Sequence, residues 1–220
     1  SARGSQWAKW DLHVHTPASV VQHFGDGYQD ETWKKYIDAL EALPPEIRVL
    51  GINDYFFLDG YRRVLREKNA GRLQNIELIL PVVEFRISSF AGHKELKKVN
   101  YHVIFSDELT ADQIETFFLR SLGMEVTLDN GTTWSGAVCH REGLIELGKA
   151  IKNSTPESKM PVESDLVVGF NNAAFPLEKI KAALRETLFQ GKAITAVGLA
   201  EWDSMRWDSG GSAALKKDII

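Results

Sequence analysis

The chain of 220 residues contains a single cysteine, Cys139, so no disulfide can form within it. This scarcity predicts a protein of a reducing compartment, the cytoplasm. The chain also lacks any run approaching the roughly 20 apolar residues of a membrane-spanning helix. Its first residues, Ser1–Ser5, lack the apolar core of a signal peptide. We therefore expect a cytoplasmic protein with no membrane partner.

An excess of positive charge is missing as well. Lysine and arginine together number 26 against 30 acidic residues, which gives a net charge of −4. Strong nonspecific binding of nucleic acid by this chain alone is therefore not expected. A nucleic-acid substrate held at a metal centre remains compatible with this charge.

Short apolar strands alternate along the chain with amphipathic helices. We expect strands near residues 10–15, 49–52, 76–83, 99–105, 165–170 and 193–199, and helices over 30–43, from 59, over 110–122, 141–152, 177–188 and 213–220. Such alternation predicts a mostly parallel α/β sheet with helical crossovers. Periodicity alone leaves an open doubly wound sheet and a barrel as alternatives. A hairpin or irregular loop is expected between Glu84 and Val99, and a surface excursion over 123–140.

The first strand carries a His-x-His pair. Because side chains alternate along a strand, His13 and His15 share one face, roughly 6–7 Å apart at Cβ. Trp10, Leu12 and Val14 are expected to pack on the other face. Pro17 cannot donate to a sheet ladder, so the pair falls at the carboxyl end of the strand. The pair predicts ligands for one divalent metal, and the alternative is two surface histidines on an edge strand.

Ionisable residues also end the next strands. Asp54 follows the second strand, Glu84 ends the third, and His102 lies within the fourth. A carboxylate after an apolar run is costly to bury unless a partner neutralises it. Asp54 alone could be a helix cap or an ion-pair partner, but the succession of strand ends predicts a metal site. Mixed imidazole and carboxylate donors suit Zn²⁺, Mn²⁺ or Fe²⁺ better than Mg²⁺.

The order of these motifs resembles the PHP (polymerase and histidinol phosphatase) family. The motifs that carry the resemblance are His13-x-His15, Gly51–Tyr55 with Asp59-Gly60, Pro81–Glu84 and the strand containing His102. The resemblance implies a distorted (β/α)7 barrel with up to three metal ions, which hydrolyses phosphomonoesters or phosphodiesters, including nucleic-acid ends. A longer string over residues 4–19, with Glu84-Phe85-Arg86, is similar to the N-terminal part of TrlF-type PHP–ATPases. This implies that residues 1–220 form a single PHP-like domain, followed by an ATPase region in the same parent chain.

Carried over to this sequence, the resemblance implies a ligand set. His13, His15 and Glu84 would bind one metal, and Glu84 would bridge to a second metal that His102 also binds. Asp54 matches the aspartate of the family's Asp-His pair, but Tyr55 occupies the histidine position, and a phenol with a pKa of about 10 is a poor ligand. Arg86 is expected to contact a substrate phosphate oxygen, or else to pair with Glu84 or Asp54.

Other ligand positions of the family have weaker counterparts here. The candidates are His23, His140, Glu201 and Asp203. The family's closing Asp-x-His is missing, since no histidine follows His140. A barrel of this class needs about 250 residues. We therefore expect an incomplete barrel whose closing strands lie beyond Ile220.

These observations predict metal-assisted hydrolysis of a phosphate ester, with a nucleic-acid end or nucleotide as the substrate class that the resemblance implies. Two alternatives stay open. One is a degenerate, non-catalytic PHP module that binds a ligand or partner. The other is an amidohydrolase barrel, which shares His-x-His but usually needs a bridging lysine, and none of the predicted strands ends in one.

Overall fold

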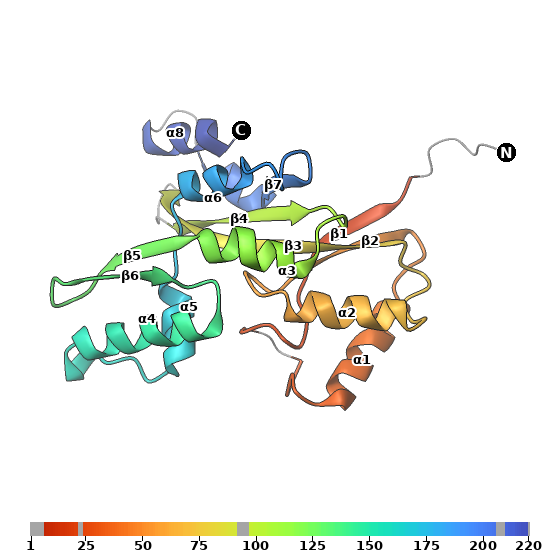
Figure 1. The fold of residues 1–220 in the computed structure, drawn as a ribbon, viewed down its shortest axis with the longest axis horizontal. Helices are drawn as coiled ribbons and strands as arrows, with labels where there is room; N and C mark the ends of the chain where they lie inside the picture. The colour runs from red at the N-terminus through yellow and green to blue at the C-terminus, as the bar shows by residue number, and fades with distance from the viewer. Residues whose placement is uncertain (1–6, 22–23, 92–96, 206–209, 220) are drawn as a thin grey trace. The chain divides into compact units, whose positions relative to one another are not determined.

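The computed structural model describes residues 7–21, 24–91, 97–205 and 210–219 (Figure 1). The candidate ligand His23 lies outside them. The chain divides into two compact units. The first comprises Ser1–Glu84 and Val103–Ala111, and the second comprises Phe85–His102 and Asp112–Ile220.

The strands of the main sheet are β1 (Lys9–Val14), β2 (Ile47–Asn53), β3 (Leu78–Ala91), β4 (Lys97–Phe105) and β7 (Ala193–Val197). They lie in the order β1-β2-β3-β4-β7, and β1–β2 and β2–β3 are parallel. The expected (β/α)7 barrel is wrong for the described residues, which form an open mixed sheet with β1 and β7 at its edges. A barrel closes only when its first and last strands pair, and here they have four strand-to-strand steps between them.

One of the predicted strands is also wrong. Residues 165–170, expected as a strand, belong to the helix α5 (Asp165–Asn172). The Ser164 hydroxyl caps this helix by accepting a hydrogen bond from the Val167 amide. Periodicity does not distinguish a short apolar strand from a buried helix. The feature of the sequence that indicates a helix here is the capping residue Ser164.

The first unit packs two helices with the parallel strands. Leu12 and Leu78 pack against a buried cluster of apolar side chains on β2, β3 and β4: Val49, Leu80, Val82 and Ile104. The helix α2 (Asp59–Asn69) packs against β2. The helix α1 (Asp30–Glu41) is joined to α2 by Arg63, which pairs with Asp30 and lies 5.5 Å over the Trp33 ring. These contacts fix the strands whose ends carry the candidate ligands.

The second unit has its own aromatic core. Phe85 meets Phe175 and Phe118 at ring-centre distances of 4.9 and 6.0 Å, and Phe118 meets Phe189 at 5.6 Å. Its helical elements are α3 (Ala111–Gln113), a π-helix (Ile114–Phe118), 3-10 turns (Leu119–Ser121 and Glu157–Lys159), α4 (Arg141–Ser154), α5, α6 (Leu177–Leu184), α7 (Leu199–Ser204) and α8 (Gly210–Ile219). The 123–140 segment contains an antiparallel pair, β5 (Gly123–Thr127) and β6 (Thr133–Ala137).

We predict that Gly51→Ala destabilises the protein by about 1–3 kcal/mol. A Cβ atom at Gly51 would lie 2.7 Å from Val82 Cγ2 and 2.8 Å from Leu12 Cα, so β1 would have to move away from β2. Gly123→Ala is the matched control, since the nearest atom to its added Cβ is 3.8 Å away. Urea unfolding of both variants measures the effect, and equal midpoints would contradict the close approach of the two strands.

Candidate metal centre

His13, on β1, and His15, which directly follows this strand, converge on one point. Their Nε2 atoms lie 3.2 Å apart and their ring centres 5.0 Å apart. The pairing of β1 with β2 is irregular between Asp11 and Val14, where three steps along β1 match two along β2. Such a bulge re-aims the side chains near it and is common beside active sites. Trp10, predicted to pack, lies on the edge strand β1 and is 55% exposed, so this prediction is wrong.

Glu84 supplies the carboxylate of the group from β3, where it lies within the strand; its predicted place at the end of the third strand is wrong, because β3 continues to Ala91. It is 4% exposed, and its Oε2 atom lies 3.6 Å from His13 Nε2. The buried Asn53 amide donates to the same Oε2 atom at 2.9 Å and so fixes its orientation. His13, His15 and Glu84 each offer a donor atom, and these atoms lie within 4.8 Å of one another.

These separations suit a shared metal ion. An ion with tetrahedral geometry and bonds of about 2.1 Å holds its ligand atoms about 3.4 Å apart. The observed separations from His13 Nε2, 3.2 and 3.6 Å, bracket this value. Two imidazoles and one carboxylate form a set found in catalytic metal sites, which leave further positions open. The donors present therefore fit a divalent ion.

Asp54 has a different role in the described structure. Its Oδ1 accepts the Thr16 amide at 2.8 Å and its Oδ2 accepts the Thr16 hydroxyl at 2.6 Å. Both residues are buried, with Asp54 1% exposed. A Cβ at Gly60 would lie 1.9 Å from Asp54 Oδ2, so the first turn of α2 closes over this pair. Asp54 thus joins the end of β2 to the residue that follows His15.

Tyr55, which stands where the family has histidine, lies against the pair. Its ring centre is 5.0 Å from that of His15. Its φ of 61° places it in the left-handed region, which is unusual for a large side chain. The turn is held by the Asn53 Oδ1 atom, which accepts the Tyr55 amide, and by the Tyr55 carbonyl, which accepts the Glu84 amide at 2.8 Å. The backbone of Tyr55 therefore helps to position Glu84.

The remaining predicted residues lie in the second unit. His102 is buried on β4, and its role as a ligand of a second metal stays a prediction. The Arg86 guanidinium lies 5.2 Å from the Phe170 ring centre and donates to the Asn171 carbonyl. His140 caps α4, its Nδ1 accepting the Gly143 amide. Of the two acids after β7, Glu201 accepts the Asn100 amide and Asp203 is exposed.

Two residues of the centre were missed by the sequence reasoning. Asn53 orients Glu84, and Thr16 fixes Asp54. Each is polar, adjoins a predicted ligand in the sequence, and is 0% exposed. Each residue could have been found in the sequence as an uncharged polar residue at a strand end, next to a predicted ligand. Such residues often hold metal ligands in place by hydrogen bonds.

Comparison with protein-family models, curated proteins and solved structures finds no match to this chain. The resemblance to the PHP family therefore stays a prediction that rests on the motifs themselves. Within the part of the chain that the structure describes, no helix has the length and apolar character needed to cross a membrane.

We predict that Asp54 makes stability depend on pH. Burial is the main cause that raises the pKa of its carboxyl from 3.8 to about 6, against the opposing hydrogen bonds from Thr16. Between these two values the unfolded chain is ionised while the folded chain keeps the proton. The contribution of Asp54 to the free energy of unfolding is therefore complete below pH 4. This contribution, roughly 3 kcal/mol, is lost as the pH rises towards 6.

Urea unfolding from pH 3.5 to 7.5 in the presence of a chelator measures this loss. Asp54→Asn cannot ionise, so the difference in unfolding free energy between this variant and the unmodified chain should change across the same pH window. A difference that stays constant would contradict the raised pKa.

Proposed function

We propose that the first unit binds a divalent metal ion through His13, His15 and Glu84 and uses it to hydrolyse a phosphate ester. The observation that carries the proposal is the convergence of these three donors within 4.8 Å. His13 lies on β1, His15 directly follows this strand, and Glu84 lies within β3; both strands pair with β2 in parallel. Val14 pairs with Ile52 and Asn53 pairs with Val82, so Glu84 lies near the level at which β1 and β2 end. The carboxyl ends of parallel strands are where α/β proteins place their sites.

The residues around the donors divide the work. The Asn53 amide holds Glu84 by a hydrogen bond, and the Glu84 side chain is buried. The His13 side chain, in contrast, is 48% exposed. A substrate can therefore approach from the His13 side without displacing the carboxylate. When bound, a divalent ion supplies Lewis-acid activation of the ester and of the attacking water. The protein holds the three donors in place before the ion binds, so few side-chain rotamers have to be fixed when it binds.

The reaction class follows from the sequence motifs. The order His-x-His, Gly51–Tyr55, Pro81–Glu84 supports a phosphoesterase, with a nucleic-acid end or a nucleotide as substrate. An ATPase region in the parent chain is part of the same proposal. The net charge of −4 indicates that recognition would depend on the metal and on local contacts more than on general attraction to phosphate.

A non-catalytic metal-binding module is the second candidate. Two observations favour it. Tyr55 occupies a histidine position, and both Asp54 oxygens are engaged by Thr16. Each feature reduces the number of ligands for a further ion. The two candidates share the metal and differ in turnover, so separate experiments address them.

We predict that the chain binds Zn²⁺ and Mn²⁺, and that His15→Ala or Glu84→Gln weakens binding at least about 100-fold. Asn53→Ala should weaken it about 10-fold, because Glu84 loses its orienting donor. His140→Asn is the matched control, since asparagine also caps a helix. Isothermal titration measures the affinities, and equal affinities in His15→Ala and His140→Asn would overturn the metal site.

We predict hydrolysis of bis(p-nitrophenyl) phosphate or p-nitrophenyl phosphate in the presence of Mn²⁺ or Zn²⁺. The double substitution His13→Ala with His15→Ala should lower the rate by orders of magnitude, and His140→Asn should leave it unchanged. Activity that survives the double substitution would refute the mechanism. Metal binding without turnover on phosphate esters would identify the non-catalytic module instead.

A further inference from the structure

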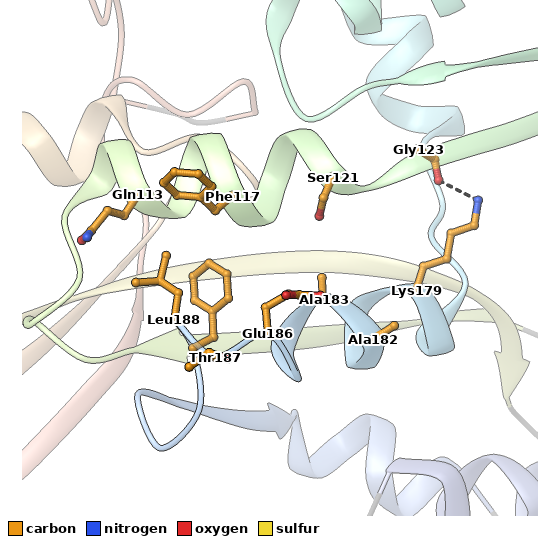
Figure 2. A pocket seen from close by; sticks show the side chains of 11 residues that line it. Gln113, Phe117, Ser121, Gly123, Lys179, Ala182, Ala183, Glu186, Thr187 and Leu188 are labelled. Carbon is orange, nitrogen blue, oxygen red and sulfur yellow. Dashed lines mark hydrogen bonds between the residues drawn. The ribbon is translucent and has the colours of Figure 1, made fainter.

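The second unit contains a groove that the metal centre does not use. Figure 2 shows its two walls, the helical segment Ala111–Ser121 and the α6 helix with the turn that follows it. Its volume is about 980 Å³, at the upper end of the range of small-molecule sites. The lining residues are Gln113, Phe117, Ser121, Gly123, Lys179, Ala182, Ala183, Glu186, Thr187, Leu188 and Phe189.

An uncommon helix forms the first wall. Residues Ile114–Phe118 are a π-helix, whose wider turns differ from those of an α-helix. Gln113, Phe117 and Ser121 are spaced four residues apart, and they all line the groove. Isolated π-turns are rare in proteins and recur at functional sites. The irregular helix is thus an observation, independent of the cavity, that points to a binding role for this wall.

The groove is apolar over one half of its length. Phe117 is 58% exposed, although large aromatic side chains are normally covered. Leu188 lies opposite it, on the segment after α6 (Figure 2), and the buried Phe189 also lines the groove. The small side chains of Ala182 and Ala183 continue this wall toward the other end. A ligand here would meet hydrocarbon on both walls.

Lys179 ends the groove on the other side. Its ammonium reaches across from α6 and donates to the Gly123 carbonyl at 3.0 Å, so it joins the two walls (Figure 2). That partner is neutral, and among the described residues no carboxylate pairs with Lys179. Two further N–H donors and a full positive charge therefore remain for a ligand. The exposed Glu186, seven residues on, disfavours an anion in the other half.

We propose that this groove binds an elongated, mainly apolar small molecule that ends in a carboxylate. The carboxylate pairs with Lys179, and the chain extends between Phe117 and Leu188. A helix of a partner protein fits less well, because it would have to cross the Lys179–Gly123 bridge, whereas a small molecule can end there. The proposal does not rest on the metal centre, since every lining residue belongs to the second unit.

Decanoate, decanol and decylamine test the proposal as three probes with one chain length and different ends. Binding is measured by titration calorimetry at concentrations below micelle formation, with a chelator present so that no carboxylate can bind a metal at His13. Decanoate should bind at least about 10-fold tighter than decanol, because one charge-assisted hydrogen bond raises the affinity by about this factor. Decylamine should bind most weakly. Absence of decanoate binding, or equal affinity for all three probes, would overturn the proposal.

A charge reversal guards against simple misfolding. Lys179→Glu should lose decanoate binding and gain decylamine binding, and a gain of affinity cannot come from an unfolded chain. Lys181→Glu, on the same helix, is the control, because the Lys181 ammonium donates to the Asp218 carbonyl and does not line the groove. The control should keep the original preference for decanoate. A matching change in both variants would show a general charge effect and refute the site.

Discussion

The candidate centre depends on the two hydrogen bonds between Asp54 and Thr16. They join the carboxyl ends of β1 and β2 at 2.6 and 2.8 Å in a place that water does not reach. In such surroundings an unpaired carboxylate is costly, so the pair is strongly favoured over any arrangement that separates the two residues. His15 precedes Thr16 and Asn53 precedes Asp54. These two hydrogen bonds, which we call the Asp54–Thr16 lock, therefore set the position of His15 and of the Asn53 amide that orients Glu84.

This arrangement assigns different tasks to two buried acids. Asp54 uses both oxygens within the protein and has a raised pKa, which marks a carboxyl in surroundings that favour its neutral form. The Glu84 Oε2 atom accepts a hydrogen bond from the Asn53 amide, and Glu84 lies beside two imidazoles. A metal could bind Glu84 without breaking the lock. Asp54 could bind an ion only through the lone pairs that Thr16 leaves unused, because both of its oxygens already accept a hydrogen bond from Thr16 and its side chain is buried.

The sequence could predict the ligands better than the architecture around them. His13 and His15 were found because they lie at the carboxyl end of a strand. Glu84 was found because it follows an apolar run, but β3 continues past it to Ala91, so its predicted place at a strand end is wrong. The bulge in β1 could not be foreseen, since it arises from pairing with β2. The exposure of Trp10 could not be foreseen either, because it depends on the place of β1 at the edge of the sheet. The helix over 165–172 was mistaken for a strand because an apolar run of that length suits either state. The barrel was inferred from resemblance, and closure depends on pairing between distant strands that local patterns do not encode.

The metal centre does not require the barrel that the sequence predicted. His13 lies on β1, His15 directly follows it and Glu84 lies on β3. Their geometry is set by β2 between the two strands, by Asn53 and by the Asp54–Thr16 lock. None of these contacts requires the sheet to close. What closure would supply is further ligands and a wall around the substrate. An open sheet with three donors that already lie close together could thus hold one ion, and the proposed hydrolysis would further depend on what covers the exposed side of His13.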